Sequence, residues 1–230
     1  MKNETKFFSG FAAIVGRPNV GKSTMMNAMV GEKVAIVSNR PQTTRNRIMG
    51  VATDKGWQIV FLDTPGLHKP RTRLGEYMVK SVQDAMDGID VLLVLVDANE
   101  IGPQDRAIVE EMSARKVKKI LVLNKTDIVE EARLMAAIQS FAEAGYDAIV
   151  PISARTGKGM DELKKLIVSY LPEGPKYFPD DMMTDQPERQ ICAEIIREKA
   201  LLELDQEIPH GIAVVIDSFR ERENQAIVDI

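Results

Sequence analysis

The sequence feature that most constrains this chain is a glycine-rich loop, Gly16–Ser23, which matches the pattern G-x-x-x-x-G-K-[ST]. The apolar run 11–15 before it is typical of a buried strand, and residues 24–30 after it predict a helix that ends at Gly31. Glycines let the backbone curl so that successive N–H groups point inward, and the helix N-terminus adds partial positive charge. This strand–loop–helix order predicts a site for the phosphates of a nucleoside triphosphate.

Three side chains of the loop have expected roles. Lys22 is expected to reach the β- and γ-phosphates, and the Ser23 hydroxyl to ligate Mg²⁺. The side-chain oxygen of Asn19 is a candidate ligand for K⁺ beside the phosphates, the alternative being that Asn19 only braces the loop. The predicted nucleotide-binding residues here are Gly16, Arg17, Pro18, Asn19, Val20, Gly21, Lys22, Ser23 and Thr24.

The tetrapeptide Asn124–Asp127 follows the apolar run 119–123 and fits N-K-x-D. The Asp127 carboxylate can accept both the ring N–H and the exocyclic amine of guanine, whereas adenine offers neither group there. We expect Asn124 to tether neighbouring loops, the Lys125 stem to lie over the base, and a backbone N–H of 153–155 to meet the guanine carbonyl. The predicted base-binding residues are Asn124, Lys125, Thr126, Asp127, Ser153 and Ala154.

A second loop, Asp63-Thr64-Pro65-Gly66, fits D-x-x-G and follows the predicted strand 57–62. Its carboxylate can hold Mg²⁺ through water, and the Gly66 N–H can approach the γ-phosphate. Leu67 stands where many small GTPases place a water-orienting glutamine, so we expect slow turnover that a partner or a monovalent cation raises. The predicted nucleotide-binding residues of this loop are Asp63, Thr64, Pro65, Gly66 and Leu67.

The long polar stretch 34–47 contains two adjacent threonines, Thr43 and Thr44. A sensor of the γ-phosphate must supply one hydroxyl to Mg²⁺ from a loop that responds to the nucleotide. Thr44 is the preferred candidate, with Thr43 as the alternative. The sequence therefore predicts catalytic roles for Lys22, Thr44 and Gly66, and metal ligation by Ser23, Thr44 and Asp63.

Composition sets outer limits on the kind of protein. The 230 residues carry a net charge of −4, so nucleic-acid binding requires a local basic patch. Cys192 is the single cysteine, which excludes a disulfide framework or zinc cluster within one chain and fits a reducing cytoplasm. The N-terminal segment 1–8 is too polar for a signal peptide, and the longest apolar run, 91–96, is far shorter than the ~20 residues that span a bilayer. We therefore expect a cytoplasmic protein, with peripheral membrane contact left open.

Strand-like and helix-like segments alternate along most of the chain. Strands are predicted over 48–53, 57–62, 91–96, 119–123 and 148–152, and helices over 74–86, 103–115, 130–144 and 160–170. This order predicts an α/β fold of the P-loop GTPase type, with a doubly wound, mostly parallel sheet. Ligands of such sheets bind at the carboxyl ends of the strands, where each of these motifs is expected to lie.

The C-terminal part of the chain has a different character. Residues 172–187 hold four prolines and show no periodicity, which indicates a linker. A helix over 191–207, a strand over 212–216 and a second strand from 226 are expected beyond it. One helix and one hairpin bury too little surface to stand alone, so the expected second, smaller α+β domain looks incomplete.

Taken together, these motifs resemble the Era family among the translation-factor-related GTPases. The resemblance covers Phe8 to about Leu171, and its specific segments are GRPNVGKST at 16–24, PQTTR at 41–45 and DTPGLHKPR at 63–71. Ile-Arg-Glu-Lys at 196–199 and Glu-Ile-Pro-His at 207–210 resemble the opening of the family's C-terminal KH domain. That combination differs from related GTPases that carry two G domains or no KH module.

The resemblance implies a G domain over 1–171, a linker over 172–189 and, over 190–230, the N-terminal part of a type II KH-like RNA-binding domain. It implies GTP hydrolysis with GTP/GDP and Mg²⁺ as cofactors, coupled to small-subunit ribosomal RNA and to assembly of the small ribosomal subunit. Some association with the inner membrane face is also implied. We further expect a monomer that binds no DNA. The G-x-x-G loop with which KH domains clamp RNA is absent from 193–230, so RNA binding is expected of the full-length protein.

Two classes of function stay open at this point. In the first, the protein hydrolyses GTP to reset an RNA- or ribosome-bound state. In the alternative, it is a nucleotide-gated RNA- or ribosome-binding scaffold whose hydrolysis is incidental. An ATPase is disfavoured by Asp127.

Overall fold

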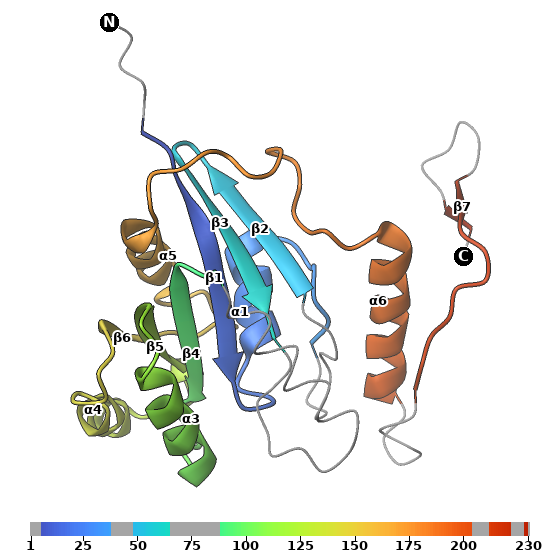
Figure 1. Cartoon of the computed structure of the whole chain (residues 1–230). Coiled ribbons are helices and arrows are strands. Elements are labelled where there is room, and N and C mark those ends of the chain that lie inside the picture. The colour runs from blue at the N-terminus through green and yellow to red at the C-terminus, as the bar shows by residue number, and fades with distance from the viewer. Residues whose placement is uncertain (1–5, 38–47, 65–87, 204–211, 222–227, 230) are drawn as a thin grey trace, which may run out of the picture.

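The computed structural model describes residues 6–37, 48–64, 88–203, 212–221 and 228–229 (Figure 1). The strands are β1 (Phe8–Gly16), β2 (Ile48–Asp54), β3 (Trp57–Asp63), β4 (Val91–Asp97), β5 (Lys118–Asn124), β6 (Ala148–Pro151), β7 (Arg220–Glu221) and β8 (Val228–Asp229). The helices are α1 (Lys22–Val30), α3 (Pro103–Ser113), α4 (Glu131–Ser140), α5 (Met160–Tyr170) and α6 (Glu188–Glu203), with a short 3₁₀ helix, η1 (Thr126–Ile128).

A six-stranded sheet forms the centre of the fold, in the order β2-β3-β1-β4-β5-β6. β2 runs antiparallel to β3, and the other neighbouring pairs are parallel. The two turn residues of the β2–β3 hairpin include Gly56, whose φ of 95° lies in the left-handed region that favours glycine. This sheet confirms the predicted α/β fold of the P-loop GTPase type.

Helices cover both faces of the sheet, which explains why its central strands are apolar on both sides. Every residue of β4 is buried. Side chains of α1 and α5 join one hydrophobic cluster, and those of α3 and α4 join another on the opposite face. Met25, Met26 and Met29 of α1 are at most 2% exposed, and each such side chain contributes about 1.5–3 kcal/mol of burial free energy.

Two predicted elements differ from the structure. The helix predicted over 130–144 ends at Ser140, because Phe141 leaves helical geometry at φ −112° and turns its buried ring into the core. The strand predicted over 212–216 is wrong: these residues form no strand, and Val215 is 80% exposed. A continuous apolar run such as 212–216 forms a strand only where a neighbour completes its backbone hydrogen bonds, and none of the described strands pairs with this segment. The predicted helix 74–86 lies outside the described residues.

The residues predicted to be a linker lie against the sheet. The segment 172–184, here called the strap, contains no helix or strand, and its Phe178 and Met182 pack on the face of β2 and β3 opposite α1. Ser9 holds its beginning, donating from the backbone to the Pro172 carbonyl (3.1 Å) and from the hydroxyl to that of Pro175 (2.6 Å). The strap therefore continues the packed unit.

Gln58 of β3 forms the central polar contact with the strap. Its Oε1 accepts hydrogen bonds from the backbone N–H groups of Tyr177 (2.9 Å) and Phe178 (3.0 Å). Its Nε2 donates to the Phe178 carbonyl (2.9 Å) and to the Thr53 hydroxyl (2.9 Å). Gln58 is fully buried, so one side chain satisfies the backbone groups of Tyr177 and Phe178 away from water.

The described part of the chain contains no helix that is both long and apolar enough to cross a bilayer.

Replacing Gln58 with leucine tests the strap contact. Gln58→Leu should lower the free energy of unfolding by about 2–4 kcal/mol, because two backbone N–H groups lose their acceptor inside the protein. Urea unfolding at neutral pH measures the change. Gln139→Leu on the exposed face of α4 is the matched control and should shift stability by less than about 0.5 kcal/mol. Equal losses in the two variants would contradict this account of the strap.

Candidate nucleotide-binding site

Four neighbouring strands end at one edge of the sheet, and three of their last residues belong to the predicted motifs. The last residues of β1, β3, β4 and β5 are Gly16, Asp63, Asp97 and Asn124. Since these strands are parallel neighbours, their carboxyl ends meet, and Asp97 lies directly opposite Asn124 in the register. The fold thus gathers segments up to about a hundred residues apart in the sequence at one place.

Two glycines shape the loop between β1 and α1. Gly16 has φ 154°, and a Cβ there would lie 2.5 Å from the Leu95 carbonyl oxygen. Gly21 has φ 97°, and a Cβ there would lie 2.3 Å from Nδ2 of Asn124. Asn19 also has positive φ, at 65°. Alternation of right- and left-handed backbone turns N–H groups toward a common centre, which suits an anion.

Lys22, the first residue of α1, lies folded over this loop. Its ammonium group donates to the carbonyl oxygens of Arg17 (2.8 Å) and Gly16 (3.2 Å). Burial lowers the pKa of Lys22 to about 8, and the nearby Asp63 carboxylate partly opposes that shift. At neutral pH the amine therefore remains mostly protonated, in a place where water shields it little.

Asp63 lies beside Ser23 at the foot of the loop. The Ser23 hydroxyl donates to Oδ2 of Asp63 (2.6 Å), whereas Oδ1 is buried with no hydrogen-bond partner among the described residues. Burial raises the pKa of Asp63 to about 6, against the lowering effects of Lys22 and Ser23. A buried, unpaired carboxylate oxygen next to a hydroxyl is a donor set that fits a hard cation such as Mg²⁺.

Asn124 connects the phosphate loop to the loop after β6. Its Nδ2 donates to the Val20 carbonyl (2.8 Å), and its Oδ1 accepts from the Ala154 N–H (3.0 Å). Asn124 is 2% exposed, so these bonds form away from water. The two loops are thereby fixed relative to each other through one side chain.

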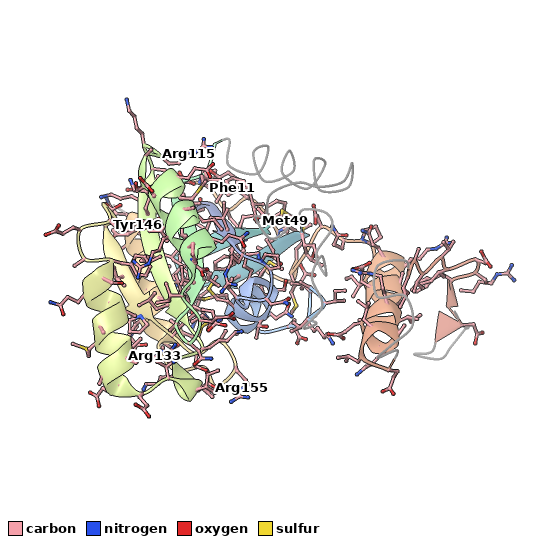
Figure 2. All side chains as sticks on the ribbon, turned by 90° about the horizontal axis from the view of Figure 1, so that it is seen from below. Phe11, Met49, Arg115, Arg133, Tyr146 and Arg155 are labelled. Atoms are coloured by element: carbon pink, nitrogen blue, oxygen red, sulfur yellow. The ribbon has the colours of Figure 1, made fainter. Side chains whose placement is uncertain are left out.

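Asp127 presents a carboxylate at the rim of the same edge. Its Oδ1 accepts from the Ser153 hydroxyl (2.7 Å) and its Oδ2 pairs with the Arg155 guanidinium (2.6 Å). The Ser153 hydrogen bond is the main cause of the lowered pKa of Asp127, with Arg155 contributing. Arg155 itself is 74% exposed and projects at the rim of the molecule (Figure 2). The carboxylate is thus ionised, oriented by Ser153 and reachable from solvent.

Comparison with known proteins identifies the family. A protein-family model described as 50S ribosome-binding GTPase matches residues 11–125. GTPase Era of Alkaliphilus metalliredigens is 55% identical over 96% of this chain and 76% of its own length. GTPase Era of Clostridioides difficile is 54% identical over 97% of this chain and 76% of its own length. This chain belongs to the Era GTPase family.

Solved structures of Era proteins superpose on nearly the whole chain. Era in complex with MgGDPNP and nucleotides 1506–1542 of 16S ribosomal RNA matches with a TM-score of 0.87 and 41% identity, over 94% of this chain and 74% of that one. A variant of Aquifex aeolicus Era bound to GDP·AlF4⁻ matches with a TM-score of 0.88 and 40% identity, over 94% of this chain and 75% of that one. The resemblance inferred from the motifs is therefore confirmed.

Two acidic residues of this Era family site, Asp97 and Asp105, belong to none of the motifs, and Arg17 and Arg155 form contacts that the motifs do not predict. The Arg17 guanidinium turns to α3, where Nε pairs with Asp105 (2.7 Å) and a terminal nitrogen donates to the Glu100 carbonyl (2.8 Å). Asp97 pairs with Lys125 (2.7 Å), and Arg155 pairs with Asp127. Asp97 has a signal in the sequence, since it ends the strand next to the one that precedes N-K-x-D. Asp105 has no such signal, and the motif that contains Arg17 does not predict that its side chain turns to α3.

The remaining predicted site residues either lie outside the described residues or have structural contacts in this structure. Thr43, Thr44, Pro65, Gly66 and Leu67 lie outside the described residues. Thr126 is buried and donates its N–H to the Ile152 carbonyl (3.1 Å), and its hydroxyl has no partner among the described residues. Thr64 donates its hydroxyl to the Ile14 carbonyl (2.7 Å), so that side chain has a structural contact. In the described part of the chain no three His, Cys, Asp or Glu residues form a metal cluster, so a metal here would use the hydroxyl and carboxylate of Ser23 and Asp63.

The raised pKa of Asp63 predicts how stability depends on pH. An aspartate with a folded-state pKa of about 6 favours folding below its unfolded value near 4, and that contribution is lost as pH rises through 6. Asp63→Asn removes the titration. The stability of Asp63→Asn relative to the wild type should therefore increase between pH 4.5 and 7.5, by up to about 3 kcal/mol.

Urea unfolding across this pH range, without Mg²⁺ or nucleotide, measures the difference. Asp161→Asn on the exposed surface of α5 serves as control and should follow the wild-type pH dependence. If Asp63→Asn also followed the wild type, burial would not govern the ionisation of Asp63.

Proposed function

We propose that this chain is a GTP-hydrolysing switch protein that acts in small ribosomal subunit assembly through ribosomal RNA. The observation that carries the proposal is the ionised, solvent-reachable Asp127 carboxylate on the same sheet edge as the phosphate loop. The phosphate loop at that edge suits a triphosphate, and the Asp127 carboxylate suits a base with two neighbouring hydrogen-bond donors.

Guanine recognition follows from the chemistry of Asp127. Its two oxygens can accept the ring N–H and the exocyclic amine of guanine as a bidentate pair, which adenine cannot offer. Ser153 holds the carboxylate from behind, and the Ala154 N–H lies nearby on the same loop. In this proposal Lys125 covers the base with its methylene stem, and Asn124 keeps the two loops in place.

Phosphate binding falls to the loop 16–24. Its inward N–H groups and the buried Lys22 ammonium neutralise the β- and γ-phosphates, and Lys22 exchanges its present carbonyl partners for phosphate oxygens. In this proposal Mg²⁺ is held by Ser23, Asp63 and Thr44. When bound, it supplies positive charge to the phosphate oxygens. The unpaired Oδ1 of Asp63 supports this assignment.

Hydrolysis in this proposal depends on electrostatic stabilisation rather than on a water-orienting glutamine. Leu67 has no hydrogen-bonding group in its side chain, so Lys22, Thr44 and the Gly66 N–H must stabilise the developing charge. Intrinsic turnover is therefore slow, and a partner or K⁺ held near Asn19 raises it. The left-handed backbone of Asn19 within the phosphate loop supports a ligand role for its side chain.

The RNA-binding part of the proposal concerns the C-terminal residues. We assign 1–171 to the G domain, 172–189 to the connection and 190–230 to the N-terminal part of a type II KH-like domain, represented by α6, β7 and β8. The Era structure that carries a 16S ribosomal RNA segment supports ribosomal RNA and the small subunit as partners of the full-length protein. We further propose a cytoplasmic monomer with peripheral contact at the inner membrane face.

The base assignment predicts a reversal of specificity. Asp127→Asn replaces one acceptor oxygen with an amide donor, so GTP affinity should fall by about 10⁴-fold while ATP binding stays weak. Xanthosine triphosphate, which carries an oxygen in place of the guanine amine, should bind this variant better than GTP. Isothermal titration with GTP, ATP and xanthosine triphosphate measures these affinities, with Asp161→Asn as the control of unchanged GTP binding. Retained GTP affinity in Asp127→Asn would rule out the assignment.

The cation assignment predicts a dependence on potassium. Turnover of GTP by the wild type should be about tenfold faster in K⁺ than in Na⁺ buffer, which corresponds to about 1.4 kcal/mol of transition-state stabilisation. Asn19→Ala should lose that difference and keep its GTP affinity within about threefold. Steady-state phosphate release in the two buffers is the measurement. Identical wild-type rates in K⁺ and Na⁺ would remove Asn19 from the proposed cation site.

A further inference from the structure

Asp97 forms two contacts at the end of β4. Its Oδ2 pairs with the ammonium group of Lys125 (2.7 Å), and its Oδ1 accepts the backbone N–H of Asn99 (3.0 Å). The Asp97 side chain is 9% exposed and that of Lys125 is 35% exposed. Asp97 is therefore the fixed partner of this ion pair, and the more exposed Lys125 side chain takes its position from Asp97.

Lys125 also has an unusual backbone conformation. Its φ of 66° lies in the left-handed region, which costs a residue with a Cβ about 1–2 kcal/mol. Lys125 caps the 3₁₀ helix η1, which contains Asp127 two residues further on. The conformation of Lys125 and the position of the Asp127 carboxylate are thus set within one tight turn.

The loop that carries Asp97 is itself fixed to both neighbours. The Ala98 N–H donates to the Asn124 carbonyl (2.9 Å), and the Arg133 guanidinium of α4 donates to the Asn99 carbonyl (2.7 Å). Asp97 consequently offers its carboxylate from a rigid position, which suits a residue that orients another side chain.

We infer that Asp97 is a positioning residue for guanine nucleotide binding. It anchors the Lys125 ammonium so that the lysine stem is stretched across the turn before Asp127, ready to cover the face of the base. Without the anchor, Lys125 samples several rotamers, and nucleotide binding must order a long side chain at a cost in affinity. The inference rests on the proposed function, because it takes Lys125 as the residue that covers the base.

Asp97→Asn is the informative substitution. The asparagine oxygen can still accept the Asn99 N–H, so the turn is kept, whereas the attraction for the Lys125 ammonium is lost. GDP and GTP affinities should each fall about tenfold, while the turnover number at saturating GTP changes less than twofold. A parallel change in affinity without a change in turnover is expected when ground state and transition state lose the same interaction.

A double-mutant cycle shows whether Asp97 acts through Lys125. Lys125→Met keeps an apolar stem and removes the charge, and it should also weaken GDP binding. If the inference holds, Asp97→Asn adds no further loss in the Lys125→Met background. The matched control is Asp147→Asn, which breaks another aspartate–lysine pair (Lys118, 2.7 Å) at the opposite end of β5 and should leave GDP affinity unchanged.

The outcomes separate this inference from the proposed function. Titration of GDP and ADP into the wild type tests the function, and equal affinities would overturn both. A GDP-selective wild type whose Asp97→Asn variant binds GDP equally well, or shows only a lower melting temperature, would overturn the inference alone. Fully additive losses in the double variant would also overturn it, because Asp97 would then act independently of Lys125.

Discussion

The two hydrogen bonds of Asn124 hold this site together. One reaches the carbonyl of Val20 in the phosphate loop, and the other receives the N–H of Ala154 in the loop after β6. The same side chain explains why position 21 must be glycine, since a Cβ there would lie 2.3 Å from Nδ2 of Asn124. The part of the site that faces phosphates and the part that faces the base are therefore one rigid unit, and affinity for a nucleotide that spans both benefits from that preorganisation.

A second constraint is electrostatic. Lys22 and Asp63 are both buried at the foot of the phosphate loop, and burial moves their pKa values toward each other, to about 8 and about 6. Neither charge is fully satisfied by the protein, because Asp63 leaves one oxygen without a described partner and Lys22 donates only to uncharged carbonyls. Such a pair destabilises the unliganded fold and interacts strongly with an incoming anion and cation, since water screens little there. The arrangement of Lys22 and Asp63 thus lowers the stability of the unliganded protein and strengthens its binding of an anion and a cation.

Local patterns in the sequence predict much of this molecule, and contacts between distant segments explain the rest. The runs that end at Gly16, Asp63, Asp97 and Asn124 are mostly apolar because both faces of the sheet are covered, by helices and, over β2 and β3, by the strap. Both the strands and the motifs that follow them could therefore be predicted from short segments of the sequence. The Arg17–Asp105 pair joins residues 88 apart, and the strap relies on Gln58 about 120 residues earlier, so no local pattern reveals either. The prediction of a strand over 212–216 was wrong for a related reason, because an apolar run does not by itself supply a hydrogen-bonding neighbour.

The C-terminal helix α6 also contacts a segment that is distant in the sequence. Glu198 of α6 is 4% exposed, pairs with Lys33 and accepts the Val37 N–H (2.9 Å). Val37 directly precedes the segment 38–47, which contains the threonines predicted to sense the γ-phosphate. A buried carboxylate that loses its partners becomes costly, so Val37 cannot move away from Glu198 without a free-energy penalty. The positions of Val37 and α6 are therefore physically coupled, and hydrogen bonds from the Thr184 hydroxyl to the Met49 carbonyl (2.7 Å) and from the Val51 N–H to the Met183 carbonyl (2.8 Å) tie the end of the strap, just before α6, to β2.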